Sequence, residues 1–128
     1  MTLKNLFIIN AIIALAYAFG ELIIPKTLLS LYFATGTPSA DILLTARFFG
    51  WGLLAVGLIC AFAVNTPPSE ARQAIVKGLF IADIVGLIVS LMGVFSGTFN
   101  TFGWSAVVIY LFLSAGFGYF WFIKPETA

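Results

Sequence analysis

The chain has 128 residues, of which 62% are hydrophobic and only 9% are charged, and its mean hydropathy is +1.12. A soluble domain carries about 25% charged residues, so this composition excludes a soluble protein and indicates an integral membrane protein. The net charge of +1 provides no basic surface for nucleic acid. The single cysteine excludes a disulfide within these residues, and the lack of histidine argues against haem and histidine-ligated metals.

Four apolar runs are long enough to cross a membrane, because a spanning helix needs about 20 apolar residues. In chain order the predicted spans are residues 5–25, 42–64, 76–96 and 102–123. Segments rich in proline, glycine and small polar residues separate them, at 25–27, 35–41, 65–70 and 96–101. We therefore expect an all-α polytopic membrane protein in which residues 1–128 form a single domain, a compact antiparallel bundle of four helices.

The first run also has features of a signal peptide, namely Lys4, an apolar stretch and Ala16-Tyr17-Ala18 as a candidate cleavage site. Because the apolar run continues past that site, we expect a retained helix. The segment 26–36 that follows is too short to span the membrane. It could form a short amphipathic turn in the interface, and a plain loop is the alternative.

Basic residues predict the orientation of the spans. Lys4, Arg72, Lys77 and Lys124 fall on one side of the predicted bundle, and Lys26 falls on the other. The positive-inside rule therefore predicts that both termini and the loop after the second span lie in the cytoplasm.

Three ionisable residues, Glu21, Arg47 and Asp83, fall inside the predicted spans. Such residues cost about 2.5–3.5 kcal/mol each at a helix centre and usually find partners in the protein. Glu21 and Arg47 should lie at similar depths on neighbouring helices, which predicts an intramembrane ion pair that clamps the first two spans. A role in substrate or proton handling, or contact of Arg47 with lipid headgroups, are the alternatives.

Asp83 has no such partner in sequence, since it should lie in the other half of the membrane. As a protonated acid it could form a hydrogen bond with Asn10, Tyr110, Ser114 or Tyr119. A role in binding a proton or a cation is the second interpretation.

Small and polar residues recur at helical spacing on one face of each span, which is typical of helix packing in membranes. The glycines that we expect at helix contacts are Gly50, Gly57, Gly86, Gly93 and Gly97. One interpretation of these faces is the interior of a packed bundle. The other is a polar cavity, whose expected lining residues are Asn10, Tyr17, Glu21, Arg47, Asp83 and Ser90.

The layout resembles a group of uncharacterised small four-helix bacterial membrane proteins. The resemblance lies in GELIIPKTLLSLY at 20–32, ARFFGWGLLAVGL at 46–58 and the alternating small residues of the third span. It implies a bacterial inner membrane and no particular activity. In size the chain is also similar to small multidrug exporters, which have a glutamate in the first helix, but Glu21 lies near the end of that helix rather than at its middle.

The first functional hypothesis is a non-enzymatic protein that acts by association, as an accessory subunit of a membrane complex or as a homo-oligomer. Its partners would be lipid, other subunits or copies of itself, with contact to a hydrophobic pigment or quinone as a further option and no bound cofactor or metal. The alternative is a small proton- or ion-coupled transporter or channel that works as an oligomer. An enzyme is the least favoured, because the sequence has no catalytic constellation and Cys60 is expected to be a buried inert thiol.

Overall fold

The computed structural model of the protein describes residues 1–34 and 36–126, and this part of the chain is helical. Its helices are α1 (Leu3–Ile23), α2 (Pro25–Tyr32), α3 (Ala40–Ala63), α4 (Glu70–Phe95) and α5 (Trp104–Gly118). A 3-10 turn, Thr101–Gly103, precedes α5, and a π-helical turn, Tyr119–Ile123, continues it. Helices α1, α3, α4 and the segment Thr101–Ile123 are long and apolar enough to cross a membrane. The prediction of an all-helical protein with four such helices is confirmed.

Several helix boundaries differ from the predicted ones, and two of the differences have a clear cause in the sequence. Helix α1 ends at Ile23, because Pro25 begins the separate helix α2. Helix α4 begins at Glu70, six residues before the predicted span. The Ser69 hydroxyl caps α4 by accepting a hydrogen bond from the Arg72 backbone N–H at 3.2 Å, and Glu70 places a negative charge in the first turn. Hydropathy alone misses such a polar first turn.

Ser69→Ala is expected to lower the free energy of unfolding by about 1 kcal/mol, because the first turn of α4 loses its side-chain cap. Unfolding in mixed micelles, followed by tryptophan fluorescence, measures the change. Ser69→Asp is the matched control, since its carboxylate retains the acceptor. Equal stability of the alanine and aspartate variants would contradict a capping role.

The segment predicted at 26–36 contains a short helix rather than a plain loop. Helix α2 starts with Pro25 at its first turn, where proline is well tolerated, and it ends with the buried side chain of Tyr32. Thr35, which belongs to the predicted breaker at 35–41, lies outside the described residues, as do residues 127–128 of the predicted domain. That α2 lies in the membrane interface stays a prediction.

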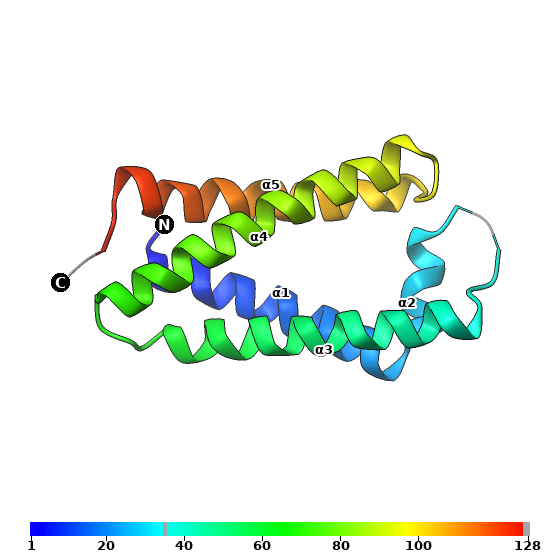
Figure 1. Cartoon of the computed structure of the whole chain (residues 1–128), viewed down its shortest axis with the longest axis horizontal. Coiled ribbons are helices and arrows are strands. Elements are labelled where there is room, and N and C mark those ends of the chain that lie inside the picture. Colours follow the sequence, from blue (N-terminus) through cyan, green and yellow to red (C-terminus); the bar gives the residue numbers. More distant parts are fainter. Residues whose placement is uncertain (35, 127–128) are drawn as a thin grey trace.

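The four long helices associate as two pairs. Helix α1 packs along α3, helix α4 packs along α5, and the pairs meet through limited contacts between α1 and α5. Figure 1 shows the start of α1, the π-helical turn Tyr119–Ile123 and the 64–69 connection at one end, called here the terminal end. Helix α2 and residues 96–103 form the opposite end, called here the α2 end. Helix α4 diverges from α3 toward the α2 end (Figure 1).

The hydrophobic core occupies the terminal end. Its buried residues are Leu3, Leu6, Phe7, Ala11, Cys60, Ala63, Val76, Leu79, Leu113, Phe117 and Phe120. They come from all four long helices, and the rings of Phe7 and Phe117 pack with centroids 5.8 Å apart. The two pairs are therefore joined tightly at one end, and their separation increases toward the other.

Most of the glycines expected at helix contacts lie at close approaches. A Cβ at Gly50 would lie 2.6 Å from Glu21 Cβ, and one at Gly57 would lie 2.7 Å from Leu15 Cγ, both on α1. A Cβ at Gly86 would meet the Tyr110 ring on α5 at 2.6 Å.

The remaining two glycines lie at the C-terminal end of α4. A Cβ at Gly93 would meet the Phe99 ring at 2.6 Å, so this glycine packs on the following turn rather than on a helix. Gly97 corrects the prediction. It follows the end of α4 with a φ of +74°, and nothing lies within 4 Å of its Cβ position. The residue terminates the helix because glycine adopts this left-handed conformation without strain.

Candidate binding cavity

A cavity of about 640 Å³ lies between the two helix pairs, on the α2 side of the core. All five α-helices contribute to its wall, and most of the lining is apolar. Cavities that bind small molecules typically measure about 300–1,000 Å³ and combine an apolar wall with a few polar groups. The cavity therefore has the size and the character of a ligand site.

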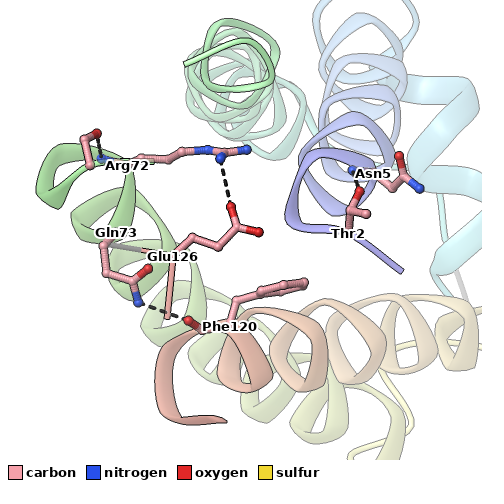
Figure 2. Close-up of polar contacts among 7 residues, drawn as sticks. Thr2, Asn5, Arg72, Gln73, Phe120 and Glu126 are labelled. Carbon is pink, nitrogen blue, oxygen red and sulfur yellow. Dashed lines mark hydrogen bonds and ion pairs between the residues drawn. The ribbon is translucent and has the colours of Figure 1, made fainter. Parts of the chain in front are cut away.

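Packing and polar contacts close the terminal end. Arg72 Nη1 donates to Glu126 Oε2 at 2.8 Å, in the one ion pair among residues 1–34 and 36–126. The Arg72 guanidinium also lies 5.5 Å from the centroid of the Phe7 ring. Gln73 Nε2 donates to the Phe120 carbonyl at 3.1 Å, within the π-helical turn (Figure 2). These contacts hold the start of α4 against the C-terminal segment.

Tyr32 organises the α2 end. Its ring packs edge-on against Phe99 and Phe102, with centroids 5.7 and 5.0 Å away, and its backbone carbonyl accepts from Asn100 N at 2.7 Å. Its hydroxyl forms a hydrogen bond with the Tyr17 hydroxyl. Burial raises the pKa of the Tyr32 hydroxyl above its usual value, so the group stays protonated and available as a donor. Tyr32 thus joins α2 to α1 and to the 96–103 segment across this end.

The exposed part of the wall lies between α3 and α4. Four lining residues are solvent-accessible in the isolated chain, namely Phe49 on α3 and Ala82, Val85 and Val89 on α4. Each of these two helices packs on another neighbour, α3 on α1 and α4 on α5. The cavity therefore reaches the surface sideways, between two helices that are apolar enough to face lipid.

Two carboxyl groups line this mostly apolar cavity. Glu21 on α1 and Asp83 on α4 are 6% exposed each. Glu21 Oε2 and Asp83 Oδ2 form no hydrogen bond with any described residue. Buried carboxyl oxygens normally have partners, because an unpaired buried polar group costs about 1–3 kcal/mol. These two oxygens are the buried side-chain oxygens of the wall that have no hydrogen-bond partner among the described residues.

Five of the six residues expected to line a cavity do line it: Asn10, Tyr17, Glu21, Asp83 and Ser90. Two of these residues, Asn10 and Ser90, donate hydrogen bonds to other atoms of the protein. Asn10 Nδ2 donates to Cys60 Sγ at 3.4 Å, and the Ser90 hydroxyl donates to the Gly86 carbonyl at 2.8 Å. The interior thus contains a cavity where the sequence left a packed bundle or a polar cavity open, but its wall is mostly apolar.

Arg47 is the exception, and the expected ion pair with Glu21 is not formed. Arg47 is exposed, and its Nε donates to the Leu22 carbonyl at 3.4 Å. The side chain lies at a separate shallow depression with Phe48 and Trp51. The physical reason is the close approach of Gly50 to Glu21, which leaves the arginine to one side of the α1–α3 contact. Glu21 and Arg47 were expected at similar depths, but they do not lie on the faces of α1 and α3 that meet.

The expected partners of Asp83 have other roles. Asn10 donates to Cys60, and the Ser114 hydroxyl donates to the Leu111 carbonyl of its own helix at 3.1 Å. Tyr110 lines the cavity with its ring against Gly86. Tyr119 is 43% exposed, beyond the end of α5.

Sequence reasoning missed the residues that close the two ends. Arg72 and Gln73 are 5% exposed each, although the sequence placed them in a loop. The serine cap followed by an acidic residue at 69–70 was the signal that α4 starts before them. Tyr32 had no comparable signal, because its partners lie far away in the chain.

No protein-family model matches this sequence, and neither a curated protein nor a solved structure matches it. The cavity itself is therefore the basis for proposing a function.

Proposed function

We propose that the protein binds an amphiphilic small molecule, which it takes sideways from the lipid phase into the cavity between its two helix pairs. The observation that carries this proposal is the combination of a cavity of about 640 Å³ with an exposed rim restricted to α3 and α4. A molecule with an apolar body can reach such a site without leaving the hydrocarbon. A carboxyl group of the wall provides a polar contact for its head.

Of the two functional hypotheses from the sequence, this proposal belongs to the transporter hypothesis, and the bound molecule would be the transported substrate.

The proposal includes an orientation of the protein in the membrane. With the termini in the cytoplasm of a bacterium, as the basic residues favour, the core and the Arg72–Glu126 ion pair lie at the inner face. The α2 end then faces outward.

The association hypothesis stays a prediction, as does the expectation that the protein is not an enzyme. The outward face of α3 carries large exposed side chains, among them Phe48, Trp51 and Phe62 at 69%, 67% and 76%. A partner subunit could cover such a face, but lipid covers it equally well. The cavity therefore provides the more specific support.

Photolabelling tests the proposal directly. The protein is reconstituted in lipid nanodiscs with a long-chain alcohol that carries a diazirine, it is irradiated, and the labelled peptides are mapped by mass spectrometry. We expect labelling of lining residues such as Leu53 and Ile109 above that of the exposed outer residue Phe62. Labelling confined to outward faces would overturn the proposal.

A variant that fills the cavity provides the matched control. Gly52 lines the cavity, and a Cβ there would meet nothing within 4 Å, so Gly52→Phe adds volume without an initial clash. Gly78 has equally open surroundings but does not line the cavity. We expect Gly52→Phe to remove the internal labelling and Gly78→Phe to leave it unchanged. Equal internal labelling in both variants would count against binding in the cavity.

A further inference from the structure

The cavity wall contains two acidic side chains, Glu21 and Asp83, and no lysine or arginine of the described residues lines it. The two side chains come from helices that belong to different pairs, α1 and α4. They lie at different levels, since Glu21 is near the α2 end of α1 and Asp83 is at the middle of α4. Each carboxyl group is therefore a separate acceptor of the wall.

The basic residues of the chain are used elsewhere. Of its six lysines and arginines, Arg72 pairs with Glu126, and Arg47 contacts the Leu22 carbonyl outside the cavity. The other four are the exposed residues Lys4, Lys26, Lys77 and Lys124. A carboxylate in an apolar cavity needs a counter-charge, because burying an isolated charge is strongly unfavourable. That counter-charge has to come from a proton or from a ligand.

The wall also contains aromatic rings that suit a cation. Tyr17, Tyr32, Phe49, Phe99 and Tyr110 all line the cavity. Aromatic faces attract ammonium groups, and the attraction is strongest where water is excluded. The Asn10 and Ser90 donors are bonded to other protein atoms, and neither wall carboxyl group has a basic partner, so a ligand that brings N–H donors complements this wall.

We propose that the ligand is a cationic amphiphile, an amine with an apolar body, and that the carboxyl group of Asp83, one turn from the contact of Gly86 with the Tyr110 ring, holds its ammonium group. This inference rests on the proposed function and specifies its ligand class. The apolar body occupies the apolar part of the wall, and the ammonium group provides the positive charge that the described residues of the wall lack. A fatty acid of the same length would bring a third carboxyl group to the same wall and is expected to bind poorly.

The experiment compares two diazirine probes of equal chain length, one a primary amine and the other an alcohol, in neutral nanodiscs at pH 7. We expect the amine to label the cavity wall about tenfold more efficiently, because hydrogen bonds to charged groups are stronger than neutral ones. Asp83→Asn should reduce this preference to about twofold or less. Asp41→Asn, at an exposed carboxylate of the first turn of α3, is the control that should keep it.

The alcohol probe separates the possible failures. If the amine and the alcohol label the wall equally, or if Asp83→Asn keeps the amine preference, the ligand class is wrong while binding in the cavity stands. If neither probe labels the wall of the wild-type protein, the proposed function itself fails. Unchanged alcohol labelling in Asp83→Asn shows that this variant keeps its fold. Should Asp83→Asn lose both labels, Asp83→Glu decides, because it keeps the carboxyl group and must retain the amine preference.

Discussion

Glu126→Ala is expected to lower the free energy of unfolding by about 3 kcal/mol, although the residue lies near the C-terminus of the chain. The variant leaves the Arg72 guanidinium buried without its partner, since this side chain is 6% exposed and Glu126 Oε2 lies 2.8 Å from its Nη1. Arg72 Nε already has no partner among the described residues, so the remaining contact with the Phe7 ring would have to hold the charge. Unfolding in mixed micelles, followed by tryptophan fluorescence, measures the loss.

A double-mutant cycle tests the mechanism of this loss. Removing the buried cation should cost less than leaving it unpaired, because the Glu126 side chain is 27% exposed and can be hydrated. Arg72→Met is therefore expected to destabilise less than Glu126→Ala, and the double variant should recover part of the loss. Lys77→Met, at an exposed position of the same helix, is the control and should change stability little. Additive losses in the cycle would contradict a coupled buried pair.

Gly50→Ala is expected to lower the free energy of unfolding by about 2 kcal/mol, because the new methyl group has no space. Its Cβ would lie 2.6 Å from Glu21 Cβ and 3.2 Å from the Ala18 carbonyl oxygen. Both atoms are fixed to the backbone of α1, so relief requires α1 and α3 to separate. Thermal unfolding of the protein in detergent, detected by tryptophan fluorescence, measures the loss.

Gly52→Ala is the matched control, one half-turn further along α3. Nothing lies within 4 Å of its Cβ position, and alanine is about 0.5–1 kcal/mol better than glycine inside a helix. The two substitutions are thus chemically identical, but they should change stability in opposite directions. A loss of similar size at both positions would show that helix contact is not the reason.

Hydropathy predicted the number of long helices, because the length of an apolar run is set by the thickness of the membrane. It did not predict the start of α4, whose first turns contain Glu70, Arg72 and Gln73. These residues follow a serine cap and lie at the end of the molecule, where polar side chains find partners in the C-terminal segment. Local capping, rather than hydropathy, determines that boundary.

The inward faces could be predicted from helical spacing, as Asn10, Tyr17 and Glu21 illustrate. The residue that meets Glu21 could not be predicted, because the depth of a residue along a helix does not show how that helix is rotated about its own axis. Arg47 lies at a suitable depth, but Gly50, three residues on, is what meets Glu21. The volume of the cavity was also beyond sequence reasoning, since it depends on how far one helix pair diverges from the other.

The pairing of the helices has a consequence for biosynthesis. Each pair is formed by neighbouring stretches of chain, α1 with α3 and α4 with α5. A ribosome that synthesises the chain from its N-terminus completes the first pair while the second is still unmade, and membrane helices can insert before they pack. Glu21 is then already in the bilayer when Asp83 arrives. The two carboxyl groups face the same space only at the final docking step, so a chain stalled after α3 would hold half of the wall and no cavity.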